Sequence, residues 1–254
     1  MYHRIVPDEA PHSTAAIDLP LGLFRRQIRM LDRWGFTSIT FEDYRLSLEE
    51  GLELPKRPII ITFDDGYAET YEFAFPVMKE FGMRGVVFVV GDRTMTSNEW
   101  DIPLGIPPTP LMNDSQILEM HAAGFEIGSH SMTHPHLARL SREEIWDQVS
   151  RSRMRLEIML NAPVNTFAYP YGELNPLVKS LVAEAGYRFA CGSWSGPPVA
   201  MTDHLEIRRA IVVSDDGPLR LAFKVLFPYR HYRWLWWRLK SVLVKDLTPV
   251  QVKP

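Results

Sequence analysis

Apolar residues along the chain follow a helical spacing in some stretches and form short continuous runs in others. Phe24, Ile28 and Leu31 recur at spacings of four and three residues, which places them on one buried face of a helix. Ser141 and Glu144 have the spacing of a capping box, which marks the start of another helix. Helix ends are indicated by a glycine before an aromatic or apolar residue, at Trp34-Gly35-Phe36, Phe81-Gly82-Met83, Ala123-Gly124-Phe125 and Ala185-Gly186-Tyr187. Helices therefore alternate with the apolar runs.

The short apolar runs are expected to be strands. They cover residues 38–41, 59–62, 85–90, 125–128, 166–168, 187–191 and 211–213. Runs of this kind between helices favour a mainly parallel sheet that is buried on both faces. About seven strand–helix units predict an α/β fold with a barrel or incomplete barrel rather than an open doubly wound sheet. We expect residues 1–226 to form this domain.

Two segments fall outside the alternation. Residues 93–113 contain four prolines between positions 103 and 110, so we expect a long irregular loop that could cover a functional site. Residues 227–254 are interpreted as a separate C-terminal helix and tail, and their first part, 227–240, is rich in tyrosine, tryptophan and arginine. We expect the aromatic side chains to pack on the barrel. The alternative is a surface helix that binds a membrane or a glycan.

Composition and charge narrow the class of protein. Of 254 residues, 46% are hydrophobic and 23% are charged, which excludes disorder, collagen and coiled coil. With 28 Lys and Arg against 31 Asp and Glu, the net charge is −3, and no excess of positive charge favours nucleic acid. The single cysteine, Cys191, cannot form an intrachain disulfide. No signal peptide and no run of about 18 apolar residues is present. We therefore expect a cytoplasmic protein, unless a segment before Met1 is missing from the sequence.

A pair of aspartates directly follows one of the expected strands. Residues 59–67 read IIITFDDGY, so Asp64 and Asp65 lie at the end of the strand, where barrel enzymes carry their catalytic groups. Neighbouring residues point in different directions, and one carboxylate can therefore bind a cation while the other faces a substrate. Gly66 permits a sharp turn. On its own, this pattern is equally typical of a turn that caps the next helix.

Histidines and a proline-containing turn follow two other strands. His130 and His134 are four residues apart, so in a helical turn both imidazoles would project from one face, a spacing suited to a transition metal. With one aspartate they would make a three-ligand site that leaves room for water. His136 is expected at the surface or behind the ligands. The sequence YPYG at 169–172 could turn backbone N–H groups toward a developing oxyanion, although a rigid apolar turn is the alternative.

The three motifs, in this order, resemble those of the polysaccharide deacetylase family, also called the NodB homology domain or carbohydrate esterase family 4. The matching segments are TFDDG at 62–66, HSMTH at 130–134 and FAYPYG at 167–172. The resemblance extends from the first strand to about Val213. It implies a distorted (β/α)7-type barrel, in agreement with the alternation of helices and strands.

The resemblance also implies roles for individual residues. Asp64 would be the general base, and Asp65, His130 and His134 would bind a divalent metal ion. A backbone N–H of Tyr171 would belong to the oxyanion hole. The metal would polarise the acetyl carbonyl and lower the pKa of bound water, whose proton the base would take.

The general acid and the arginine of the family depart from the common pattern. The usual histidine of a Leu-x-His motif near the C-terminal end of the domain is absent from this sequence. A circularly permuted subfamily, which includes deacetylases of poly-N-acetylglucosamine, places a Tyr-His pair on the first strand, and Tyr2-His3 matches it. This match implies that His3 is the general acid; without it, His3 would be interpreted as a solvated side chain. The arginine that steadies the catalytic carboxylate is expected to be Arg209 rather than Arg208, and the alternative is a surface basic pair.

The resulting hypothesis is a metal-dependent hydrolase that removes N-acetyl groups from an N-acetylated amino sugar in a polysaccharide or glycan precursor. The ligand set favours Zn²⁺, with Co²⁺ or Ni²⁺ as alternatives. An O-acetyl esterase or a hydrolase of non-sugar amides would use the same residues. A third alternative is a catalytically silent carbohydrate-binding protein. The expected partner is the glycan, and nothing in the sequence indicates an oligomeric state.

Overall fold

A six-stranded parallel sheet forms the centre of the protein. The computed structural model describes residues 1–9, 17–104, 107–193 and 203–226. Neighbouring strands follow one another in the order β5 to β10, and every neighbouring pair is parallel. The strands are β5 (Thr62–Phe63), β6 (Val86–Val89), β7 (Glu126–Ser129), β8 (Thr166–Ala168), β9 (Phe189–Gly192) and β10 (Ile207–Arg208). Because each strand lies beside the one that precedes it in the sequence, the sheet winds in one direction, as a barrel does.

The first residues of the chain close this sheet into a ring. The backbone N–H of Tyr2 donates to the carbonyl of Thr62 at 2.8 Å, and the N–H of Asp64 donates to the carbonyl of Tyr2 at 3.1 Å. On the other side, the N–H of Val212 donates to the carbonyl of Met1 at 2.9 Å. The N-terminal segment therefore lies between β5 and the chain that follows β10. It supplies the seventh position of the distorted (β/α)7-type barrel, whose α/β class the structure confirms.

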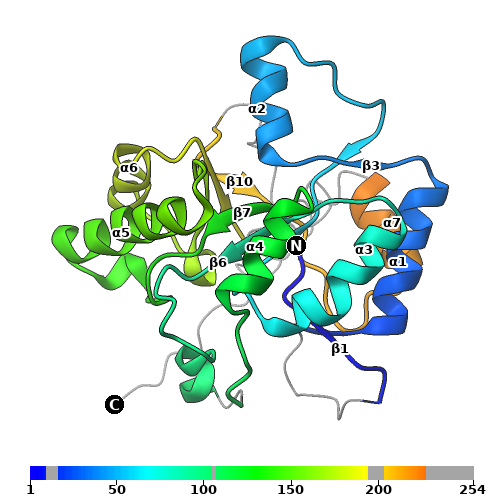
Figure 1. Cartoon of the computed structure of the whole chain (residues 1–254), viewed down its shortest axis with the longest axis horizontal. Coiled ribbons are helices and arrows are strands. Elements are labelled where there is room, and N and C mark those ends of the chain that lie inside the picture. Colours follow the sequence, from blue (N-terminus) through cyan, green and yellow to red (C-terminus); the bar gives the residue numbers. More distant parts are fainter. Residues whose placement is uncertain (10–16, 105–106, 194–202, 227–254) are drawn as a thin grey trace, which may run out of the picture.

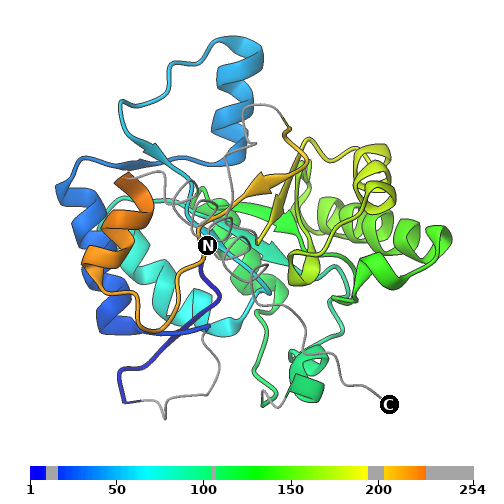
Figure 2. The same cartoon turned by 180° about the vertical axis from the view of Figure 1, so that it is seen from behind.

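Helices cover the outside of the barrel. Figures 1 and 2 show α5 and α6 at one end of the molecule and α1, α3 and α7 at the other, with the central sheet between them. The capping box of Ser141 and Glu144 begins α5, as the sequence predicts. The helices are α1 (Leu21–Arg33), α2 (Phe41–Glu50), α3 (Phe75–Glu80), α4 (Asp114–Ala122), α5 (Arg142–Leu160), α6 (Pro176–Glu184) and α7 (Pro218–Leu226). Short helical turns are η1 (Thr70–Ala74), η2 (Glu99–Leu104), η3 (Leu137–Arg139) and η4 (Pro170–Gly172).

Two small parallel ladders stand beside the central sheet. They pair β1 (Arg4–Val6) with β2 (Asp18–Pro20), and β3 (Thr37–Ser38) with β4 (Pro58–Ile59). The predicted strand over 59–62 is therefore divided between two sheets, because Ile59 pairs with β3 whereas Thr62 pairs with β6.

Two other predicted strands are wrong. The strand expected over 38–41 ends at Ser38, because Thr40 accepts a hydrogen bond from the Asp43 N–H and, in a capping box, begins α2 at Phe41. The strand expected over 211–213 is absent from the described part of the chain, where β10 comes earlier, at Ile207–Arg208. Residues 210–212 form backbone hydrogen bonds with Met1, which is a single residue and not a complete neighbouring strand. This pairing is too short to continue β10.

The expected C-terminal helix and tail, 227–254, lie outside the described residues, so the domain boundary after residue 226 stays a prediction. Within the ranges that the structure describes, no helix is long and apolar enough to cross a membrane.

Candidate active site

The motifs predicted from the sequence meet in one pocket at the carboxyl ends of the strands. Asp64 and Asp65 follow β5, His130 follows β7, and Tyr171 lies in the turn after β8. The pocket has a volume of about 180 Å³. It is lined by His3, Ile17, Asp64, Asp65, Asp101, His130, His134, Tyr169, Tyr171 and Ser193. The carboxyl end of a parallel barrel is where the backbone of successive strands delivers side chains from different parts of the sequence to one place.

Asp65, His130 and His134 form a buried cluster with the geometry of a metal site. Nε2 of His130 lies 3.1 Å from Oδ1 of Asp65, and Nε2 of His134 lies 3.4 Å from the same oxygen. All three side chains are buried, and one potential ligand atom from each lies within 4.8 Å of the others. In the part of the chain that the structure describes, this is the one group of three such residues. The cluster contains the residue types that bind divalent transition metals.

The two histidines converge through an irregular turn, and the expectation of a helical turn is wrong. Residues 130–134 are not helical. Ser131 and His134 both have left-handed backbone angles, with φ of 65° and 60°, and the His134 N–H donates to Oγ of Ser131 at 3.0 Å. Asp65 is also left-handed, with φ of 71°. Such angles are unfavourable for side chains larger than glycine, and they concentrate at functional sites that over-determine them.

The surroundings favour an ionised Asp65 and a neutral His134, whereas the hydrogen bond and charge of Asp65 outweigh burial and raise the pKa of His130. Although burial alone would raise the pKa of Asp65, hydrogen bonds from His130 and His134 hold it well below its ordinary value. Burial lowers the pKa of His134, which favours the neutral imidazole. Nδ1 of His130 lies 2.7 Å from the carbonyl oxygen of Ala168. Because a carbonyl only accepts, Nδ1 carries the proton and Nε2 faces Asp65.

Asp64 is paired with Arg209 in a buried, two-pronged contact. Nη1 and Nη2 of Arg209 donate to Oδ1 and Oδ2 of Asp64, each at 2.6 Å. Arg209 also donates to Oγ1 of Thr62 at 3.0 Å and to the carbonyl of Gly192 at 3.2 Å. Burial alone would raise the pKa of Asp64, but the charge of Arg209 keeps it below its ordinary value. Asp64 is therefore ionised at neutral pH.

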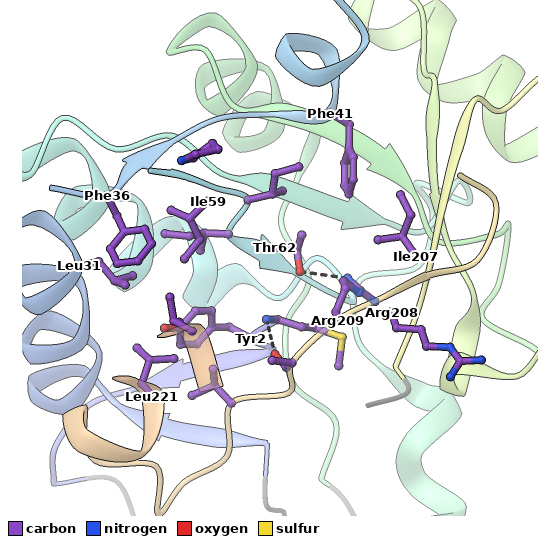
Figure 3. A pocket seen from close by; sticks show the side chains of 17 residues that line it. Tyr2, Leu31, Phe36, Phe41, Ile59, Thr62, Ile207, Arg208, Arg209 and Leu221 are labelled. Atoms are coloured by element: carbon purple, nitrogen blue, oxygen red, sulfur yellow. Dashed lines mark hydrogen bonds between the residues drawn. The ribbon is translucent and has the colours of Figure 1, made fainter. Parts of the chain in front are cut away.

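The guanidinium groups of Arg209 and Arg208 have different partners, although both residues line one cavity. Figure 3 shows Arg209 beside Thr62 on the wall of a second cavity of about 480 Å³, which is lined mostly by apolar side chains. Arg208, its neighbour, is partly exposed and pairs with Glu206 at 3.1 Å. Of the two arginines considered from the sequence, Arg209 is thus the one that the structure brings to Asp64.

His3 and Tyr171 complete the pocket. His3 lines it from the N-terminal segment, and its Nδ1 atom is buried without a hydrogen-bond partner. Tyr171 has a left-handed backbone with φ of 57°, and its amide N–H donates to no carbonyl of the residues that the structure describes. The ring of Tyr171 stacks on His136, with centroids 3.9 Å apart, and His136 in turn pairs with Glu173 at 3.0 Å. His136 therefore lies behind Tyr171 rather than among the three clustered side chains.

The loop over 93–113 contributes residues that sequence analysis missed. It is not wholly irregular, since η2 spans Glu99–Leu104. Trp100 stacks on His134, with ring centroids 4.7 Å apart and planes inclined by 23°. Asp101 is buried and lines the pocket. Neither residue belongs to a spaced motif, and the expectation that this loop covers a site was the only signal that pointed to them.

The fold and the site together define a parallel α/β barrel with a carboxylate and histidine centre at the carboxyl ends of its strands. The chain belongs to the polysaccharide deacetylase family, a family of hydrolases that act on amide bonds. The family's model matches residues 51–190, which is more than half of the 254 residues.

Individual relatives agree with this membership. YxkH of Bacillus subtilis (strain 168), whose name assigns it to the polysaccharide deacetylases, is 25% identical over 203 residues, which cover 80% of this chain and 66% of YxkH. The poly-β-1,6-N-acetyl-D-glucosamine N-deacetylase of Staphylococcus aureus (strain MRSA252) is 23% identical over 203 residues, which cover 76% of this chain and 67% of that protein. The chain thus spans about two thirds of the length of these relatives.

A solved structure supports the fold. The deacetylase PplD of Streptococcus pyogenes, determined in complex with acetate, superposes with a TM-score of 0.75 at 23% sequence identity. The match covers 88% of this chain and 95% of that one. The barrel architecture is therefore shared over nearly the whole of both chains.

Proposed function

We propose that this protein is a metal-dependent hydrolase that removes N-acetyl groups from an N-acetylated amino sugar in a polysaccharide or glycan precursor. The observation that carries the proposal is the convergence in one pocket of the buried Asp65, His130 and His134 cluster with the Asp64 carboxylate, which Arg209 keeps ionised. The name of the Staphylococcus aureus relative supports an N-acetylated glucosamine polymer as the class of substrate.

Asp65, His130 and His134 would hold the metal ion. Their fit rests on two features of the cluster: both Nε2 atoms face one carboxylate oxygen, and burial favours a neutral His134. Zn²⁺ suits one oxygen and two nitrogen donors, and Co²⁺ or Ni²⁺ would be accepted by the same atoms. When bound, a divalent ion supplies Lewis acidity that polarises a carbonyl and lowers the pKa of water.

The remaining residues would move protons and stabilise charge. Asp64, ionised beside Arg209, is placed to take the proton of the water that attacks the amide carbon. The Tyr171 N–H, which has no carbonyl partner among the described residues, is available to donate to the oxyanion that develops. His3 would then give a proton to the departing amine, so that the carbon–nitrogen bond breaks to release a free amino sugar and acetate.

The experiment that tests this function is acetate release from metal-stripped protein reloaded with Zn²⁺, Co²⁺ or Ni²⁺. The substrates are β-1,6-linked N-acetylglucosamine oligomers and their O-acetylated counterparts. We expect metal-dependent release from the N-acetylated oligomers. Asp64→Asn should abolish turnover by the fully loaded protein while zinc binding is retained.

A matched control separates loss of the base from a general effect of the substitution. Asp147 lies on α5 and pairs with Arg151 at 2.9 Å in a solvent-accessible contact, so Asp147→Asn should keep full activity. Undiminished turnover by Asp64→Asn would overturn the assigned mechanism. Release from the O-acetylated oligomers alone would instead assign an esterase.

A further inference from the structure

Asp101 is held rigidly by two buried polar side chains. Its Oδ2 atom accepts a hydrogen bond from the hydroxyl of Tyr67 at 3.1 Å and another from Nδ2 of Asn98 at 3.1 Å. Nδ2 of Asn98 also donates to the Tyr67 hydroxyl at 3.2 Å, and Oδ1 of Asn98 accepts from the Thr109 N–H at 2.5 Å. Tyr67 and Asn98 are fully buried. These contacts fix both the position and the rotation of the carboxylate.

The second oxygen of Asp101 is left for the pocket. Throughout the described ranges of the chain, no group donates a hydrogen bond to Oδ1, and no basic side chain pairs with Asp101. The residue nevertheless lines the site, where His3, Asp64 and Tyr171 also lie. Oδ1 has no hydrogen-bond partner among the described residues, yet it is not fully buried and keeps some exposure to solvent.

A carboxylate in this position is not needed for the loop itself. An asparagine would accept the same two hydrogen bonds from Tyr67 and Asn98, and it would avoid the cost of burying a charge without a cation. Asp101 shares the pocket with His134 and Tyr171, so its free oxygen borders the groups of the site. An acceptor with this charge is best satisfied by a hydrogen-bond donor of the substrate.

We propose that Asp101 is a specificity-determining residue whose Oδ1 accepts a hydrogen bond from a ring hydroxyl of the sugar that carries the scissile acetamide. The inference rests on the proposed function, because it takes an amino sugar as the substrate. The donor is a hydroxyl rather than an ammonium group, since a fully N-acetylated chain carries no amine. An anionic sugar would be disfavoured, because Asp64 and Asp65 already place two negative charges in the same pocket.

The test compares zinc-loaded wild type, Asp101→Ala and Asp101→Asn on fully N-acetylated β-1,6-linked tetramers. The parent tetramer is measured beside analogues whose sugars lack the 3-hydroxyl or the 4-hydroxyl. A hydrogen bond to a charged acceptor predicts that wild type loses about 10- to 100-fold in kcat/KM on one of the two analogues. Asp101→Ala should lose about as much on the parent, and should distinguish that analogue from the parent by less than about threefold.

Two further measurements separate recognition from a structural effect. Asp101→Asn keeps an acceptor for Tyr67 and Asn98, so it should fold and bind zinc as wild type does while losing about 3- to 10-fold in kcat/KM on the parent. Asp147→Ala, which removes an aspartate from the solvent-accessible face of α5, should match wild type throughout.

The outcomes are distinguishable. Wild-type kcat/KM in both Asp101 variants, or a loss of activity in which the discrimination against the analogues is retained, would overturn the assignment of Asp101 and leave the proposed function intact. Weakened zinc binding in Asp101→Asn would assign the residue to the metal site and would also overturn it. Absence of acetate release by wild type from every tetramer would overturn the proposed function and this inference together.

Discussion

Replacing Arg209 with methionine should destabilise the protein strongly, because it leaves the Asp64 carboxylate buried without its cation. The side chains of Arg209 and Asp64 are only 6% and 3% exposed, and the guanidinium makes four hydrogen bonds. Removal of one partner from a buried ion pair costs about 3–5 kcal/mol, mainly through the charge that is left behind. We therefore expect Arg209→Met to lower the free energy of unfolding by about 3–5 kcal/mol at pH 7.5.

A double-mutant cycle tests whether the buried charge is the cause. Asp64→Asn removes the charge, so the double variant Asp64→Asn/Arg209→Met should recover most of the loss and lie within about 1–2 kcal/mol of wild type. The assay is guanidinium unfolding of metal-free protein in the presence of a chelator. Arg151→Met is the control, because Arg151 pairs with Asp147 in solvent, where a pair contributes about 0.5 kcal/mol or less.

The pH dependence gives the same argument a second check. The pKa of Asp64 is lowered in the folded protein, so its ion pair contributes stability above the ordinary carboxyl pKa and loses it as the pH falls through the lowered pKa. Without Arg209, burial should raise the pKa of Asp64, and the carboxyl group then needs no cation once it is protonated. The deficit of Arg209→Met should therefore shrink between pH 7.5 and pH 5. A deficit that is independent of pH, or losses that add in the double variant, would refute the reasoning.

Three other substitutions have defined outcomes. His130→Ala should weaken zinc binding by at least about 100-fold in equilibrium dialysis, and unchanged affinity would contradict its assignment as a ligand. Trp100→Leu removes the ring that stacks on His134, whose Nδ1 lacks a partner, so it should weaken zinc binding by about 10-fold while the protein stays folded by circular dichroism. Burial raises the pKa of Glu126 to about 7. Between the ordinary glutamate pKa and about pH 7, the folded protein therefore keeps a proton on Glu126 that the unfolded chain releases. The free energy of unfolding falls as the pH rises over that range. Glu126→Gln should remove that fall and be more stable than wild type by about 2 kcal/mol at pH 8 in guanidinium unfolding; equal pH profiles would contradict it.

Helix and strand positions followed from the sequence where a single local signal decided them. The run at 166–168 is β8 as predicted, since it is a short apolar strand in the middle of a sheet. The run at 38–41 failed because its hydrophobic pattern suits a strand, whereas the Thr40 and Asp43 capping box favours a helix start. An apolar run does not indicate which sheet its strand joins. The run at 59–62 therefore predicts one strand, whereas the structure has two short ones.

The site was predictable to the extent that its residues end strands. Asp64 and His130 each follow a strand directly, Asp65 is the residue after Asp64, and parallel strands bring such positions together. The contact of His134 with Asp65 depends on left-handed residues in an irregular turn, which no periodicity reports. Asp101 was beyond reach for a related reason, because its place in the pocket is set by hydrogen bonds within a proline-rich loop rather than by a strand.

The closure of the barrel and the electrostatics of the proposed base are the same structural feature. The N-terminal segment that carries His3 lies between β5, which Asp64 directly follows, and the chain after β10, which carries Arg209. The ion pair between Asp64 and Arg209 therefore spans the seam where the ring closes, and the backbone of Tyr2 bonds to Asp64 within that seam. A barrel that failed to close here would separate the carboxylate from its cation, raise its pKa by burial, and remove His3 from the pocket. Residues 3, 64 and 209 are far apart in the sequence, but they lie on three adjacent backbone segments. The positions of the proposed acid, base and charge partner therefore depend on one short backbone ladder.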